Sequence, residues 1–417
     1  MWVILMTKYV IIGNGVSALL AAKAIASIDY ATPIKIISTN NHKTISKPAL
    51  SYLLKNKLTL SQLQRLPDDF YVQTNLDMIN KKVQRIDPIN KQVVFTDNKK
   101  QAYDKLLLAQ GSEPVIPDCG GLEKDNIITC HTLSDVQKIK ESLQKITKAV
   151  VIGAGPTGLE IASVLAEKKI DVVIIEKSNY ILNSIIPLEY MDIIISQYRK
   201  KGVRFILKDE VKHCGGVDNK ATYVETEKGA RFEAQLIILC CGVNPKIDII
   251  EKTKIRRHRG ILVDNTMKTT VKDIWSAGSV TELENEYTNT RAVLPYWNVC
   301  SQMGTVAGYN MAGKHKVLEL GNNLFSCELA DKQFHLVGTI ECDDTRNKCS
   351  VIEDINRLEG RFLRFVFNDN MLVGACWYGR GPNPFTLKQL IDSETIIEAS
   401  KKELLSKTFN WEHLLKV

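Results

Sequence analysis

Two glycine-rich turns, each set between a strand and a helix, constrain this 417-residue chain more than any other feature. The first copy, residues 8–37, contains an apolar strand, the turn Gly13–Ala18, an alanine-rich helical stretch and a second strand. The second copy, residues 149–176, repeats that order around the turn Gly153–Gly158. One such motif is weak support, but two in the same strand–turn–helix–strand setting predict two nucleotide-binding folds.

The spacing of small residues in both turns suits a bound dinucleotide. The first glycine allows the tight turn, the second lets the backbone approach a pyrophosphate, and the third small residue keeps helix and strand close together. The helix N-terminus then presents free N–H groups and a positive dipole end to the phosphates. The residues that we assign to this role are Gly13, Asn14, Gly15, Val16, Ser17 and Ala18 in the first copy, and Gly153, Gly155, Pro156, Thr157 and Gly158 in the second.

The end of the second strand distinguishes the two copies. Glu176 lies roughly 20 residues beyond Gly155, where an acid accepts hydrogen bonds from the adenosine ribose. A carboxylate there repels a 2′-phosphate and favours NADH over NADPH, although the adjacent Lys177 weakens that preference. The alternative is that Glu176 is only a solvated strand end. The first copy has Ser38 and Thr39 where the acid is expected, which predicts a weaker hold on its adenosine.

The remaining patterns complete an α/β chain. Strands are expected at 83–88 and 92–95, a helix at 296–311, and an α+β region with a polar helical tail beyond about residue 317. We predict an α/β fold with two Rossmann-like nucleotide-binding domains and a small α+β C-terminal domain that serves as an interface or dimerisation domain. The predicted boundaries are 1–117 with 244–317 for the first domain, 118–243 for the second, and 318–417 for the third.

Composition narrows the class of protein. The net charge of +8 is modest for this length, and no basic helix or arginine tract marks a nucleic-acid binder. The excess favours an acidic partner; its densest run, 252–259, is either a solvated face or a docking patch for a small acidic electron carrier. No apolar run reaches the roughly 18 residues that span a membrane. Ten cysteines without zinc-like spacing, and no secretion signal, predict reduced thiols, no metal site and a cytoplasmic location.

With the strand endings Ala109–Ser112 and Trp275–Ser279, the two folds resemble the FAD-dependent pyridine-nucleotide oxidoreductases. The most similar branch contains the NADH:rubredoxin and ferredoxin reductases and the flavin domain of nitrite reductases. The resemblance covers nearly the whole chain and implies FAD in the first fold and NAD in the second. The positions it assigns to the FAD site are Lys47 and Pro48 against the flavin ring, Val83 at the adenine, and Thr39, Ala109, Gln110, Gly111, Gly278, Ser279, Trp297, Asn298 and Gln302.

Three of these FAD positions depart from the family pattern. Thr39 replaces an acid, Gln110 replaces a threonine, and Ser279 replaces the aspartate that holds the ribityl chain. Ser279 can still form a hydrogen bond, but the loss of a charge-assisted acceptor weakens binding by about 1–2 kcal/mol. The resemblance therefore implies an FAD that is loosely held. In the NAD site it assigns Glu160 to a position beside the nicotinamide and Gly242 to the close of the site.

Residues 42–51 contain no cysteine, whereas family members that reduce disulfides or peroxides carry thiols on this segment. The resemblance therefore implies that electrons leave the flavin directly. Cys240 and Cys241, on an apolar strand, are expected to pack rather than to form a redox pair. The leading hypothesis is a flavoprotein oxidoreductase that passes hydride from NADH to FAD and then electrons to a rubredoxin- or ferredoxin-type carrier. Lys47 and Glu160 are its catalytic residues: Lys47 stabilises the reduced flavin or only pairs with an acid, and Glu160 orients the nicotinamide.

Two alternatives remain open at this stage. The acceptor is small in the first, which makes the chain an NADH oxidase or a reductase of a quinone or metal chelate. The second is a flavin-poor, NADH-binding partner subunit of a larger complex. A homodimer is compatible with each of these hypotheses.

Overall fold

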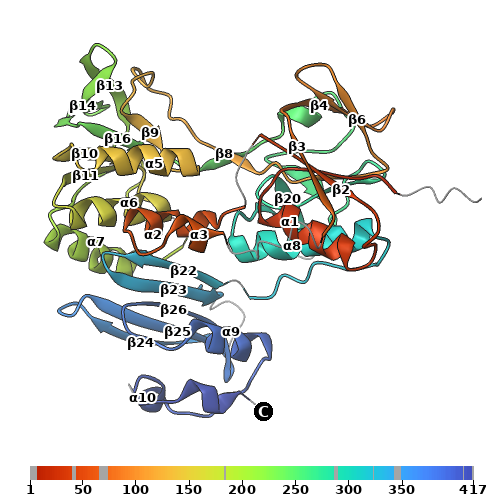
Figure 1. The fold of residues 1–417 in the computed structure, drawn as a ribbon. Coiled ribbons are helices and arrows are strands. Elements are labelled where there is room, and N and C mark those ends of the chain that lie inside the picture. The colour runs from red at the N-terminus through yellow and green to blue at the C-terminus, as the bar shows by residue number, and fades with distance from the viewer. Residues whose placement is uncertain are drawn as a thin grey trace, which may run out of the picture. The chain divides into compact units, whose positions relative to one another are not determined.

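The computed structural model describes residues 7–39, 44–64, 74–182, 185–285, 290–322, 324–341, 349–406 and 408–415 (Figure 1). The chain forms two compact units, each built from two separate segments. Unit 1 comprises Met1–Glu113 and Val243–Leu320, and unit 2 comprises Pro114–Gly242 and Gly321–Val417. Each unit is of the α/β type and has its own five-stranded parallel sheet, so the predicted fold class is confirmed.

The parallel sheet of unit 1 has the strand order β19-β7-β1-β2-β3. Its strands are β1 (Tyr9–Ile12), β2 (Ile34–Ser38), β3 (Leu76–Asn80), β7 (Lys105–Leu108) and β19 (Ile274–Ser276). All four residues of β1 are buried. An uninterrupted apolar strand of this kind is what a sheet covered on both faces requires.

Two helices of unit 1 that are distant in the sequence, α1 (Val16–Ala26) and α8 (Trp297–Met311), pack side by side (Figure 1). Two glycines of α8 allow the close approach. A Cβ atom on Gly304 would lie 2.2 Å from the carbonyl oxygen of Ser17, and one on Gly308 would lie 2.3 Å from that of Ala21. The Ser17 hydroxyl also donates to the Cys300 carbonyl at 2.8 Å.

Smaller elements complete unit 1. The short helices are η1 (Lys47–Ala49), α2 (Leu50–Leu54), α3 (Leu60–Leu63) and η3 (Asp248–Ile250). The predicted strands at 83–88 and 92–95 are β4 (Val83–Asp87) and β5 (Gln92–Phe95), which pair antiparallel and continue to β6 (Lys100–Ala102). A further sheet contains β18 (Ile261–Val263), β20 (Thr281–Asn285) and β21 (Thr290–Val293). A two-stranded sheet pairs β8 (Ser112–Pro114) with β17 (Val243–Pro245), at the points in the sequence where one unit ends and the other begins.

The parallel sheet of unit 2 has the order β12-β11-β10-β16-β9. Its strands are β9 (Ile127–Thr129), β10 (Lys148–Ile152), β11 (Asp171–Glu176), β12 (Arg204–Leu207) and β16 (Leu236–Leu239). The helices that accompany them are α5 (Leu133–Ser142), α6 (Pro156–Glu167), η2 (Leu188–Tyr190) and α7 (Met191–Lys200). A three-stranded antiparallel sheet is formed by β13 (Val211–Val217), β14 (Lys220–Thr226) and β15 (Arg231–Glu233).

The C-terminal part of unit 2 is an antiparallel sheet of order β22-β23-β26-β25-β24 (Figure 1). Its elements are β22 (Leu324–Leu329), β23 (Lys332–Gly338), β24 (Cys349–Asn356), β25 (Arg361–Asn368), β26 (Met371–Tyr378), α9 (Pro384–Asp392), α10 (Lys401–Leu404) and η5 (Trp411–Leu414). The Tyr190 ring stacks on Phe362 with centroids 4.2 Å apart, and the N–H of Ala330 donates to the Ser163 hydroxyl at 3.0 Å. These contacts join the sheet to the second nucleotide fold, and the finer three-domain division stays a prediction.

The cysteines depart from one expectation. Eight described cysteines are free thiols, but Cys349 is disulfide-bonded, so the prediction of reduced thiols is wrong at this residue. Cys349 begins the edge strand β24, and sequence spacing alone does not report its oxidation state. Cys342 lies outside the described residues. No helix among the described ranges is both long enough and apolar enough to cross a membrane.

Candidate functional site

The first glycine turn has the geometry that its sequence predicts. Gly13 follows β1 with a φ of +117°, and a Cβ atom there would lie 2.0 Å from the carbonyl oxygen of Ala109. Its N–H donates to the Ile37 carbonyl at 2.8 Å, which ties the turn to β2. Ala18 is fully buried in the first turn of α1. A side chain at position 13 would therefore displace the backbone of the neighbouring strand.

The second glycine turn repeats this arrangement. Gly153 has a φ of +105°, and a Cβ atom there would lie 2.3 Å from the carbonyl oxygen of Cys240. Its N–H donates to the Ile175 carbonyl at 2.8 Å. A Cβ atom on Gly158 would lie 2.0 Å from the Gly153 carbonyl oxygen, so the third glycine allows α6 to approach the strand.

The middle glycine of each turn faces open space, which is the room that a bound dinucleotide needs. Gly15 and Gly155 are the N-caps of α1 and α6, and a Cβ atom on either would meet nothing within 4 Å. Neither helix has a side-chain cap or an acid in its first turn. The N–H groups of the first turn of each helix, which in α6 begin after Pro156, therefore remain available to an anion, supported by the helix dipole. Both turns fit a pyrophosphate.

Glu176 ends β11 and reaches back to the second turn. One carboxylate oxygen accepts from the N–H of Ala154 at 2.7 Å, and the other accepts from the N–H of Ser178 at 2.8 Å. Each oxygen keeps a lone pair that can accept a ribose hydroxyl. Lys177 forms an exposed ion pair with Glu210 at 2.9 Å, so its charge is already engaged.

Several predicted FAD-site residues gather at the carboxyl edge of the unit 1 sheet. Gln110 follows β7, and its amide N–H donates to the Lys246 carbonyl at 2.8 Å. Its carbonyl oxygen is buried and accepts no hydrogen bond in the described chain, which makes it an orphaned acceptor that a ligand donor would satisfy. Ser279 follows β19 and shares a hydrogen bond with Ser112 at 3.1 Å. Gly278 packs so closely that a Cβ atom would lie 2.5 Å from the Ser17 hydroxyl oxygen.

The other predicted FAD-site residues lie at several places in unit 1. Lys47 and Pro48 are exposed in η1, and Thr39 is exposed just after β2. Val83 begins β4 and packs against the core of unit 1. Trp297 begins α8, and its carbonyl accepts from the Ser301 hydroxyl at 2.7 Å.

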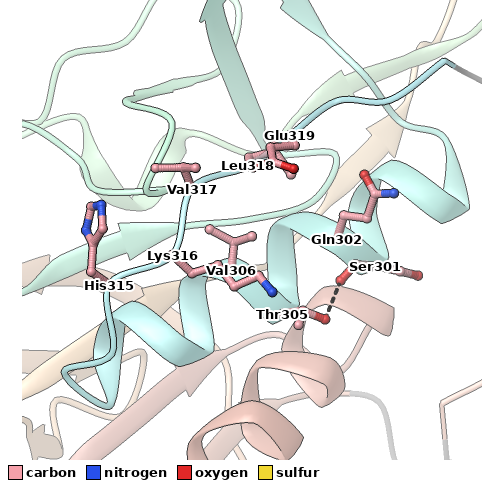
Figure 2. A pocket seen from close by; sticks show the side chains of 9 residues that line it. All are labelled: Ser301, Gln302, Thr305, Val306, His315, Lys316, Val317, Leu318 and Glu319. Atoms are coloured by element: carbon pink, nitrogen blue, oxygen red, sulfur yellow. Dashed lines mark hydrogen bonds between the residues drawn. The ribbon is translucent and has the colours of Figure 1, made fainter. Parts of the chain in front are cut away.

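Gln302 lines an open groove between α8 and residues 315–319, which Figure 2 shows in close-up. Asn310 shapes the groove, because its side-chain amide donates to the Lys316 carbonyl at 2.6 Å. The groove has a volume of about 570 Å³. The sequence pattern does not indicate this groove, because the bonds of residues 315–319 to Asn310 and to Asn265 form only in the folded chain.

In unit 2, the charge of Glu160 on α6 acts on three thiols, which the sequence did not reveal. Cys327 is buried, and Cys130 and Cys240 are half-buried. Burial raises the pKa of Cys130 to about 12, and the charges of Asp135 and Glu160 add to the rise. Burial, assisted by Glu160, also raises the pKa of Cys240 and of Cys327. Cys130 follows β9 and Cys240 follows β16, at the ends of paired parallel strands. These thiols are poor nucleophiles at neutral pH, as the packing role of Cys240 predicts.

Gly242 lies in the short segment that follows β16. It has a φ of +98°, and a Cβ atom there would meet nothing within 4 Å. Its carbonyl accepts from the N–H of Val115 at 2.9 Å, close to the point where the chain leaves unit 2. The glycine thus serves a tight backbone turn, and it leaves open space at the end of the strand.

Comparison with known proteins places these features in a family. Residues 7–304 match the family model described as pyridine nucleotide-disulphide oxidoreductase. The chain is 26% identical over 377 residues to the NADH-dependent phenylglyoxylate dehydrogenase subunit epsilon of Aromatoleum evansii, covering 88% of this chain and 87% of that protein. It is 28% identical over 390 residues to the NADH-rubredoxin oxidoreductase of Clostridium acetobutylicum, covering 93% of this chain and 95% of that protein.

The fold is also similar to a solved structure. The crystal structure of the covalent putidaredoxin reductase–putidaredoxin complex contains a chain that matches with a TM-score of 0.87 and 20% sequence identity. The match covers 98% of each chain. At this level of identity the likeness concerns the fold.

Proposed function

Because the chain belongs to the pyridine nucleotide-disulphide oxidoreductase family, we propose that it passes hydride from NADH to FAD and then electrons to a small acidic carrier protein of the rubredoxin or ferredoxin type. The chain is an FAD-dependent NAD(P)H oxidoreductase; the choice of NADH and of the carrier is the proposal. The observation that carries it is the pair of glycine turns, each with an uncapped helix N-terminus and open space at its middle glycine.

The first turn and the strand ends beside it would hold FAD. Gly13–Ala18 would receive the pyrophosphate, and the orphaned carbonyl of Gln110 and the hydroxyl of Ser279 would accept hydrogen bonds from the ligand. Thr39 would face the adenosine, with Val83 at the adenine and Trp297 at the start of α8 beside the flavin. FAD, when bound, supplies a two-electron acceptor that can release electrons one at a time.

The second turn would hold NADH. The carboxylate of Glu176 would accept from the ribose hydroxyls, and its negative charge would repel the 2′-phosphate of NADPH. Lys177 does not offset this repulsion fully, because Glu210 pairs with its ammonium group. Both features favour NADH over NADPH. Gly242 would lie at the close of this site.

Lys47 and Glu160 are the proposed catalytic residues. The ammonium group of Lys47 would stabilise the negative charge that develops on reduction, and Glu160 would orient the nicotinamide. We expect Lys47→Ala to slow reduction of bound FAD by NADH while NADH affinity stays unchanged, as measured by stopped-flow absorbance and NADH titration. An unchanged reduction rate would remove Lys47 from this role and leave it a structural ion-pairing residue.

The electrons are proposed to leave for an external carrier because no suitable thiol accompanies the site in the part of the chain that the structure describes. The described residues 44–51 contain no cysteine. Cys300 on α8 is buried, and burial raises its pKa to about 11. A thiol of that kind is protonated at neutral pH and does not attack or relay electrons readily.

One comparison favours a second function. The relative from Aromatoleum evansii is by name a subunit of an NADH-dependent dehydrogenase, and its match covers most of both chains. This chain would then act as the NADH-binding subunit of a larger complex, with FAD held weakly at Thr39, Gln110 and Ser279. Flavin content of the purified protein distinguishes this function from that of a free-standing reductase.

The first experiment is visible absorption of the purified protein, with and without added FAD, followed by anaerobic NADH. We expect two flavin bands that bleach when NADH is added. Bands that require added FAD would support the weakened FAD site. No bands under either condition would contradict the oxidoreductase proposal and favour the NADH-binding subunit.

A further inference from the structure

The basic run 252–259 of unit 1 ends in a tight, exposed turn. The N–H of Leu262 donates to the Arg256 carbonyl at 3.0 Å, and the N–H of His258 donates to the Gly260 carbonyl at 3.1 Å. These bonds reverse the chain just before β18. Arg256, Arg257, His258 and Arg259 are all exposed on this turn.

A buried acid holds the turn in place. Glu282 on β20 is only 1% exposed. Its carboxylate accepts from the N–H of Gly260 at 2.9 Å and shares a hydrogen bond with His258 Nδ1 at 3.0 Å. A Cβ atom on Gly260 would lie 2.9 Å from the Val280 carbonyl oxygen, so the glycine allows this close seat. The turn is therefore rigid, and little conformational entropy would be lost if a partner bound it.

Four of the five Lys and Arg side chains on this run have no ion-pair partner among the described residues. Among the described residues, no carboxylate lies within ion-pairing distance of Lys252, Lys254, Arg256 or Arg259, and Arg257 has Glu251 at the outer limit of 3.9 Å. Two lysines elsewhere in unit 1 do form ion pairs, Lys81 with Asp97 at 2.8 Å and Lys91 with Asp273 at 2.7 Å. Packing like charges into a turn opposes folding.

The charge of the whole chain is concentrated in the same unit. Unit 1 carries 26 Lys and Arg against 16 Asp and Glu, whereas unit 2 carries 29 against 31. The excess of +8 therefore comes entirely from unit 1, and the turn is its densest part. A field of this sign steers and captures an acidic partner.

We propose that the turn Arg256–Arg259, with Lys252 and Lys254, is the docking surface for the acidic electron carrier. This inference rests on the proposed function, since it names the surface that the carrier meets. A protein partner is favoured over nucleic acid because residues 251–264 contain no phenylalanine, tyrosine or tryptophan on which bases could stack.

The test compares two triple variants with equal loss of charge. The first is Arg256→Gln/Arg257→Gln/Arg259→Gln, and the control is Lys138→Gln/Lys140→Gln/Lys145→Gln, which neutralises three exposed lysines of unit 2. NADH-driven reduction of a purified rubredoxin gives KM and kcat for the carrier. Reduction of menadione, an uncharged quinone, reports the flavin chemistry without docking.

We expect the arginine variant to raise the KM for rubredoxin about tenfold at low ionic strength, with kcat and menadione reduction unchanged. The difference should shrink at high salt, and Arg256→Lys/Arg257→Lys/Arg259→Lys should restore most of the affinity. An equal rise in the lysine control would overturn the proposal, because net charge alone would explain it. So would an unchanged KM, or a wild-type protein whose turn binds duplex DNA but not rubredoxin.

Failure of the proposed function has a separate signature. A wild-type protein with bound FAD that reduces neither menadione nor rubredoxin contradicts the reductase itself. A wild-type protein that reduces both, with an arginine variant that behaves identically, contradicts only the docking surface.

Discussion

The first glycine turn leads from β1 into α1 and the second from β10 into α6, and their backbones are nearly the same. Gly13 and Gly153 have φ values of +117° and +105°, and each donates its N–H to a carbonyl of the next strand at 2.8 Å. The strand ends differ: β11 ends in Glu176, which binds the second turn, whereas β2 is followed by the exposed Thr39. From this difference we expect the backbone of the turn to fix where a dinucleotide can lie, and the strand-end side chain to set how tightly it is held.

The largest expected effect on ligand binding comes from substituting the first glycine of one turn at a time. Gly13→Ala should weaken FAD binding, and Gly153→Ala NADH binding, by at least about 100-fold, because each methyl group would collide with a strand carbonyl at a strained φ. Flavin absorbance after dialysis measures the first, and NADH fluorescence titration measures the second. Each variant is the control for the other. Loss of both ligands in either variant would show that the two turns do not act separately.

An exchange of the strand-end residues tests the comparison directly. Glu176→Thr should weaken NADH about tenfold and remove the preference over NADPH, because the charge-assisted acceptor is lost. Thr39→Glu should strengthen FAD binding by a similar factor. The measurements are Kd values for NADH, NADPH and FAD. An unchanged FAD affinity in Thr39→Glu would contradict the proposed contact between position 39 and the adenosine.

A smaller gain is expected at Ser279, the residue that the family resemblance assigns to the ribityl chain. Ser279→Asp should strengthen FAD binding about fivefold, since a carboxylate accepts a hydroxyl hydrogen bond more strongly than a serine does. The matched control is Ser112→Ala, which removes the 3.1 Å partner of Ser279 without adding charge. Equal effects in the two variants would attribute the change to the lost serine pair instead.

The smallest effect is expected at Lys177. Because Glu210 already pairs with this exposed lysine, Lys177→Ala should change the Kd of NADH and NADPH by less than about twofold. The same titrations measure it. A tenfold loss of NADPH affinity alone would mean that Lys177 contacts the 2′-phosphate.

The two glycine turns could be predicted from short sequence patterns, whereas features that depend on contacts between distant residues could not. Gly13 and Gly153 could be predicted because a tight strand-to-helix turn demands a positive φ, which a short sequence motif records. The bond of Glu176 to Ala154 and the burial of Glu282 beneath the basic turn depend on partners that are distant in the sequence. The assignments of Lys47, Glu160 and the flavin positions stay predictions from the family resemblance.

The contact between α1 and α8 carries a consequence for how the protein is made. Ser17 and Ala21 of α1 seat against Gly304 and Gly308, and β7 pairs with β19, which is synthesised much later. The first nucleotide fold therefore cannot be completed until roughly three-quarters of the chain has been synthesised. All five parallel strands of the second fold, in contrast, lie between Ile127 and Leu239. We expect the second parallel sheet to assemble on the ribosome first, and the first fold to depend on chaperones while its apolar helix face waits for α8.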